Sequence, residues 1–123
     1  MRYLTDRKRA TGLGASGQGT HHHYQMLISS ILMVVVVPLF VFTFGAGMGG
    51  TREEVIAYFS RPWPAIVTGL GMIVILNHVK NEAHEAIEDY VHGMAERFAL
   101  IATSALTYTL MAMGLFALVK IAL

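Results

Sequence analysis

The segment LNHVKNEAHEAIEDYVHG, residues 76–93, concentrates the side chains that could do chemistry in this chain. It holds three of the six histidines, four of the eight carboxylates and one lysine. Imidazole nitrogens can bind iron or other metals, carboxylates can bind cations, and a tyrosine hydroxyl can donate a hydrogen bond to a carbonyl. The segment is therefore the first candidate for a binding site.

Helical geometry would sort these side chains onto two faces. One face carries a histidine and three acids: His78, Glu82, Glu85 and Asp89. A second row could pair a lysine with a glutamate through a histidine: Lys80, His84 and Glu88. Beyond about residue 80 a helix can leave the membrane, so simple solvation also accounts for a charged face there.

His78 and Tyr90 are the two residues in the segment that best fit a ligand. His78 directly follows the apolar run GMIVIL, and an ionisable group at a membrane boundary usually faces protein, cofactor or water. Its imidazole could bind haem iron or bond to a neighbouring helix. Tyr90 lies twelve residues on, about 18 Å along a helix. Its phenol could donate to a quinone carbonyl or belong to an interfacial aromatic belt.

Two other histidine patterns carry less information. The run HHH at 21–23 could bind a metal or a cofactor's carboxylates, or lie in a solvated juxtamembrane loop. His84 and Glu85 begin an H-E-x-x-E string, which lacks the second histidine of a zinc protease site.

The elements that must position these residues are apolar helices. The chain has 123 residues, is 54% hydrophobic and only 14% charged, and has a mean hydropathy of +0.54. Three blocks without formal charge, at residues 26–44, 64–79 and 98–119, approach the ~20 residues that cross a bilayer as a helix. We predict one all-α integral membrane domain, residues 1–123, with transmembrane helices at about 26–44, 64–87 and 98–119.

Glycine, proline and charge signals in the sequence predict how the helices are connected and how they are oriented in the membrane. Residues 1–25 are predicted to be a basic, Gly/Ser-rich cytoplasmic loop, and Pro38 is expected to kink the first helix. Pro62-Trp63-Pro64 predicts a helix start at the interface, and Gly93 ends the second helix or the loop after it. Six Lys and Arg residues on one side against three on the other place the N-terminus in the cytoplasm and the C-terminus in the periplasm.

Composition also excludes several classes of function. The absence of cysteine excludes disulfides, thiolate metal sites and iron–sulfur ligation by this chain. A net charge of +1 gives no reason to expect a nucleic-acid partner. The first apolar block is too long and starts too late for a cleaved signal peptide.

Taken together, these motifs resemble the hydrophobic membrane anchor subunit of succinate dehydrogenase, the smaller of the two anchors of respiratory complex II. SGQGTHHHY, Ser16–Tyr24, fits the family's SG-x-x-H segment, and three helices follow. His78 stands twelve residues before the tyrosine of DYVHG, Asp89–Gly93, as in the family. The opening RYLTDRKRATGLGASGQGT looks like the alphaproteobacterial branch.

The resemblance implies a role for each of these residues. His78 would be one axial ligand of a b-type haem, and a partner anchor would supply the other. Tyr90, with Asp89 beside it, would lie at the ubiquinone site. His22, or His21 under a one-residue shift, would lie near the haem propionates. Glu82 departs from the glycine usual four residues after the haem histidine, so we expect it to crowd a porphyrin or contact another subunit.

The implied function is that of a membrane anchor of succinate:ubiquinone oxidoreductase, in the tricarboxylic acid cycle and aerobic electron transport. Its partners would be a flavoprotein subunit with FAD, an iron–sulfur subunit and a cytochrome b-type anchor, in the bacterial inner membrane. No succinate-oxidising site is expected in this chain. Two alternatives stay open: a fumarate-reductase-type quinol anchor, and a small membrane adaptor or metal-ion carrier.

Overall fold

The computed structural model describes residues 3–15 and 17–123. Arg2 of the basic tail and Ser16 of the N-terminal motif lie outside the described residues. Within them the secondary structure is helical throughout: α1 (Asp6–Thr11), α2 (Gly19–Ala46), α3 (Arg52–Phe59), α4 (Pro62–Tyr90) and α5 (Met94–Ala122). The all-α prediction is confirmed.

Three of these helices have the length and composition of membrane spans. They are α2, α4 and α5, with 28, 29 and 29 residues, each about 42–44 Å long. Each is longer than the ~30 Å of hydrocarbon, so their ends extend into the interfacial regions. The prediction of three spanning helices is confirmed.

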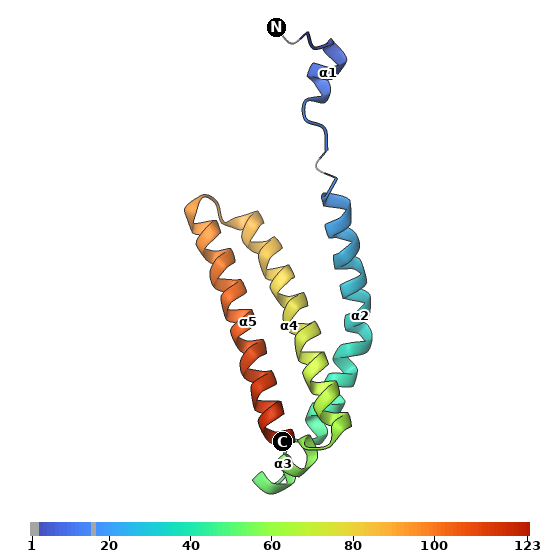
Figure 1. The fold of residues 1–123 in the computed structure, drawn as a ribbon, viewed down its shortest axis with the longest axis vertical. Coiled ribbons are helices and arrows are strands. Elements are labelled where there is room, and N and C mark those ends of the chain that lie inside the picture. Colours follow the sequence, from blue (N-terminus) through green and yellow to red (C-terminus); the bar gives the residue numbers. More distant parts are fainter. Residues whose placement is uncertain (1–2, 16) are drawn as a thin grey trace.

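Helix α4 is the centre of the arrangement. It packs against both α2 and α5, whereas α2 and α5 make no packing contact with each other in the described chain. Figure 1 shows α4 between the two. Of the most apolar stretch of each helix, 22% of α4 is buried but only 6% of α2 and of α5. The outer faces of α2 and α5 are therefore apolar surfaces for lipid or other subunits.

Small residues let the helices approach closely. Gly71 of α4 faces Phe40 of α2, and a Cβ at Gly71 would lie 2.8 Å from the Phe40 ring. Gly114 of α5 likewise lies beneath the Met72 side chain of α4. Close approach of backbones over glycine is a usual basis of helix association in membranes.

The N-terminal region is more helical than its composition predicts. Residues 6–11 form α1, where Thr5 Oγ1 accepts from the Lys8 backbone N–H at 3.3 Å. Helix α2 begins at Gly19 rather than near residue 26, since His21–Gln25 contains no helix breaker and its side chains bond within α2 and to α4. The loop expected over 1–25 is therefore only partly present.

The connections between the helices determine which residues lie at each end of the bundle. The link between α2 and α4 contains α3, which starts with a capping box between Thr51 and Glu54. Pro62 is the first residue of α4, as its position in Pro-Trp-Pro predicts. Gly93, with φ +75°, separates α4 from α5. The residues around His22 and Tyr90 thus lie at one end of the bundle, and α3 and the C-terminus lie at the other (Figure 1).

Candidate functional site at the α2–α4 interface

His78 lies between α2 and α4 and is far less exposed than His22. Its side chain is 14% exposed. Its Nδ1 is 2.7 Å from the hydroxyl oxygen of Ser29 on α2, which is a hydrogen bond between two helices. The imidazole is therefore fixed by α2 and not by α4 alone.

The second ring nitrogen of His78 faces an acid on its own helix. Nε2 is 3.6 Å from Oε1 of Glu82, one turn further along α4. The distance is too long for a good hydrogen bond, and the Glu82 side chain is 55% exposed. Glu82 is thus free to rotate away and leave Nε2 open to a ligand.

A hollow lies next to Ser29 on the α2–α4 interface. Its volume is about 340 Å³, and residues of both helices line it: Gln25, Ile28, Ser29, Leu32, Ile73, Val74 and Asn77. Most of its wall is aliphatic. His78 does not itself line this hollow, but Ser29, the hydrogen-bond partner of its imidazole, does.

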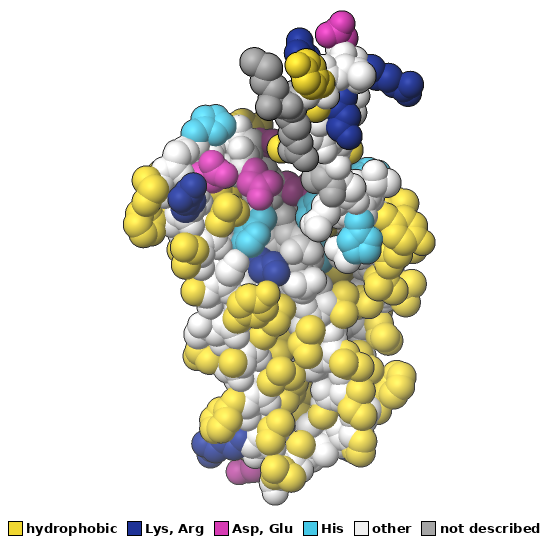
Figure 2. Space-filling view, turned by 45° about the horizontal axis from the view of Figure 1, so that its top comes forward, with side chains coloured by type: hydrophobic (Ala, Val, Ile, Leu, Met, Phe, Trp, Pro, Cys, Tyr) yellow, Lys and Arg dark blue, Asp and Glu magenta, His cyan; other side chains and the backbone are white. Residues whose placement is uncertain are grey.

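Two of the N-terminal histidines, His22 and His21, have different hydrogen-bond partners. His22 Nε2 lies 3.2 Å from Oε1 of Glu85, which joins α2 to the outer part of α4. His21 instead bonds Gln25 within α2, at 2.9 Å. Histidine and acidic side chains gather towards one end of the molecular surface in Figure 2, above a largely apolar body. Both side chains of the His22–Glu85 pair are exposed, so the pair contributes little to stability.

The expected Lys80–His84–Glu88 row does not form. Lys80 and His84 face α5, where Lys80 Nζ donates to the Tyr108 hydroxyl at 3.2 Å and His84 Nε2 lies 3.1 Å from Ser104 Oγ. Lys80 Nζ also lies 5.1 Å from the Tyr108 ring centroid. Tertiary contacts with α5 replace the local pairing, which is a weak interaction on an exposed helix face.

Asp89 and Tyr90 form the last turn of α4, on the side of the bundle away from α3. Both are exposed, Tyr90 by 86%. His78 and Tyr90 are therefore not brought together: they are separated by twelve residues of unbroken helix, about 18 Å. The predicted residues occupy two places, His78 inside the helix interface and Asp89–Tyr90 at its exposed end.

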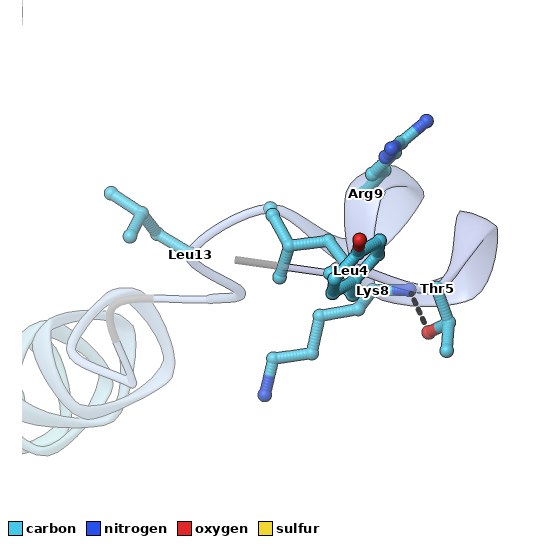
Figure 3. Close-up of a pocket in the computed structure, with 7 residues that line it drawn as sticks. Leu4, Thr5, Lys8, Arg9 and Leu13 are labelled. Carbon is cyan, nitrogen blue, oxygen red and sulfur yellow. Dashed lines mark hydrogen bonds between the residues drawn. The ribbon is translucent and has the colours of Figure 1, made fainter. Parts of the chain in front are cut away.

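Neither a metal cluster nor the hollow around α1 offers a competing site. Among the described residues, no three His, Asp or Glu side chains are grouped to hold a metal ion. A hollow of about 750 Å³ lies around α1 (Figure 3), and all its lining residues fall within 3–13. It shares no residue with the His78 region.

Ser29 is the site residue that the sequence did not single out. Ser29 and Ser30 are two adjacent polar residues within the first apolar run. Such a pair is the one available signal, because a hydroxyl inside a membrane helix usually bonds its own backbone or another helix. Which of the two serines faces α4 depends on helix packing.

Comparison with known proteins decides the family. The model of the succinate dehydrogenase/fumarate reductase transmembrane subunit family matches residues 1–119. The chain belongs to this family. A relative from Paracoccus denitrificans, the succinate dehydrogenase hydrophobic membrane anchor subunit, is 36% identical over 123 residues, covering 100% of this chain and 95% of the relative. No solved structure matches the chain.

Membership in the succinate dehydrogenase membrane anchor family agrees with the fold. The chain is a multi-pass membrane protein built from three spanning helices. Its exposed apolar faces on α2 and α5 are available to lipid or to other subunits. The resemblance drawn from residues 16–24, His78 and Asp89–Gly93 is confirmed at the level of the family.

Proposed function

We propose that this chain anchors a succinate:ubiquinone oxidoreductase in the bacterial inner membrane, completes its ubiquinone site with Tyr90 and Asp89, and shares a b-type haem through His78. The observation that supports the proposal is a mostly buried imidazole held between two membrane-spanning-type helices of an anchor-family chain. The N-terminus would face the cytoplasm and the C-terminus the periplasm.

His78 is the residue of this chain that would hold the haem. Neutral imidazole is a common haem ligand, and its second nitrogen is usually hydrogen-bonded by the protein. The Ser29 bond at Nδ1 leaves Nε2 as the binding nitrogen once Glu82 rotates away. When bound, the haem would supply one-electron exchange within the membrane. The cytochrome b-type anchor would supply another residue that holds the haem.

His22 would not reach haem propionates while it is paired with Glu85. Both partners are exposed and the pair is weak, so an arriving propionate could replace Glu85 as the acceptor. His21, which bonds Gln25 within α2, has no such cross-helix partner and is the weaker candidate of the two.

Tyr90 and Asp89 would contribute to the quinone site from the end of α4. The Tyr90 hydroxyl would donate a hydrogen bond to a quinone carbonyl. Its 86% exposure in the single chain leaves the hydroxyl available to a site completed by the iron–sulfur subunit. Succinate oxidation would take place in the flavoprotein subunit, with FAD and iron–sulfur clusters carried by the partners.

The test is the substitution Tyr90→Phe in the assembled complex. Loss of one hydrogen bond of about 0.5–1.5 kcal/mol predicts a roughly twofold to 13-fold drop in ubiquinone reduction. Succinate oxidation by an artificial acceptor should be unchanged. Tyr24→Phe, at an exposed tyrosine near the start of α2, is the matched control. Equal loss of both activities in the Tyr90 variant would show that Tyr90 does not act at the quinone.

A quinol:fumarate reductase anchor is the second candidate, because the matching family includes fumarate reductase subunits. The relative from Paracoccus denitrificans carries the succinate dehydrogenase name, which favours the first candidate. Comparing succinate oxidation by ubiquinone with fumarate reduction by a low-potential quinol, in the same purified complex, separates the two directions.

A further inference from the structure

We propose that Ser29 is the positioning residue of the haem ligand: its hydroxyl accepts the Nδ1–H of His78 and so holds Nε2 towards the iron. The inference rests on the proposed haem role of His78 and deepens it. It concerns the hydrogen bond between the His78 ring and Ser29 on a second helix.

The contact has the geometry and burial of a specific interaction. The Oγ–Nδ1 distance is 2.7 Å, the bond is part-buried, and it joins residues 49 apart in sequence. Ser29 comes from α2 and His78 from α4, the helices that pack against each other at the centre of the fold. A rigid hydrogen bond from a neighbouring element is what fixes both the orientation and the tautomer of a metal-binding histidine.

A serine hydroxyl can pair with His78 both before and after haem binding, because a hydroxyl donates a hydrogen bond as well as accepts one. Before haem binds, the hydroxyl can donate to Nδ1 while Nε2–H points to the Glu82 carboxylate 3.6 Å away. With iron on Nε2, the imidazole proton must be on Nδ1, and the same hydroxyl then accepts it. An alanine or valine at position 29 can do neither.

The neighbouring Ser30 provides a matched comparison. Its hydroxyl donates to the Met26 carbonyl of its own helix at 2.9 Å, so it makes a local bond in place of a cross-helix one. The two serines have the same chemistry, the same helix and adjacent positions. They differ in their partners, and Ser29 is half-buried whereas Ser30 is exposed.

The experiment uses the intact complex purified with all its subunits, carrying Ser29→Ala, Ser29→Val, Ser29→Thr or Ser30→Ala. Three readouts do not depend on activity: the rate of haem transfer to a haem-scavenging apoprotein, the haem midpoint potential, and the g-values of the oxidised haem. Valine and threonine have nearly the same shape, so this pair separates the hydroxyl from packing even if the alanine variant assembles poorly.

Loss of the hydroxyl should speed haem release about tenfold, the lower end of the 10–100-fold effects of such outer hydrogen bonds. The midpoint potential should rise, because an imidazole that donates from Nδ1 is more basic and favours ferric iron. Ser29→Thr and Ser30→Ala should behave as wild type. The inference is overturned if Ser29→Val matches Ser29→Thr, or if Ser29→Ala matches Ser30→Ala. Failure of the proposed function is a separate result: His78→Ala would then leave the haem signal unchanged.

Discussion

The sharpest prediction about the fold compares two glycines of α4, Gly71 and Gly69, each changed to alanine. A Cβ at Gly71 would lie 2.8 Å from Cδ2 and 3.3 Å from Cβ of Phe40 on α2. A Cβ at Gly69 would meet Leu118 and Leu115 of α5 at ordinary contact distances, 3.5 and 3.6 Å. Only the first substitution forces two helices apart.

The magnitude follows from the difference between the two variants. Both gain about 1 kcal/mol of helix propensity when glycine becomes alanine, so this gain cancels. Only Gly71→Ala loses stability through overpacking, by about 1–3 kcal/mol. Phe40 cannot turn aside freely, because its ring is stacked on Phe44 with centroids 5.4 Å apart. The two variants should therefore differ by about 1–3 kcal/mol, roughly fivefold to 150-fold in the unfolding equilibrium.

The assay is unfolding of the chain in mild detergent micelles by added dodecyl sulfate, followed by far-ultraviolet circular dichroism. Gly71→Ala should unfold at the lower dodecyl sulfate concentration. In the assembled complex it should also disturb the haem spectrum, because the same α2–α4 contact carries the Ser29–His78 bond. Equal stability of the two variants, or a less stable Gly69→Ala, would refute the packing argument.

Substitutions at three further residues test other features of the fold, each by the same unfolding assay. Tyr58→Phe removes the bond from the Tyr58 hydroxyl to the Thr43 carbonyl, 2.7 Å and part-buried, and should cost about 1 kcal/mol; no change would mean that this bond does not hold α3 to α2. Gly93→Ala should cost about 1–3 kcal/mol, since φ +75° with ψ −141° is a glycine conformation; a neutral result would mean that the turn before α5 adjusts. Tyr108→Phe should cost less than Tyr108→Leu, because the phenyl ring keeps the cation–π contact with Lys80 and only leucine removes it; equal costs would contradict that contact.

The sequence predicted the elements with strong periodic or compositional signals. Charge-free runs gave the three spanning helices, and Pro-Trp-Pro gave the start of α4. Helix α3 also has a sequence signal, the capping box formed by Thr51 and Glu54. The early start of α2 has no such signal in the sequence, because glycine, serine and histidine favour loops where no tertiary contact opposes them.

The candidate site was predictable as a list of residues but not as a set of contacts. His78 and Tyr90 follow from residue type and spacing along one helix. The partners of His78 and Lys80 do not, because Ser29 and Tyr108 lie on other helices whose rotation depends on side-chain packing. The expected Lys80–Glu88 pairing failed for the same reason.

The most direct test of the central claim is a reduced-minus-oxidised visible spectrum of the native complex, extracted in mild detergent, for wild type and His78→Ala. The account predicts a b-type haem signal in the wild type. In the variant it predicts that this signal is lost or shifted while the subunits stay associated. An unchanged signal in His78→Ala would contradict the assignment of His78 as the haem ligand of this chain.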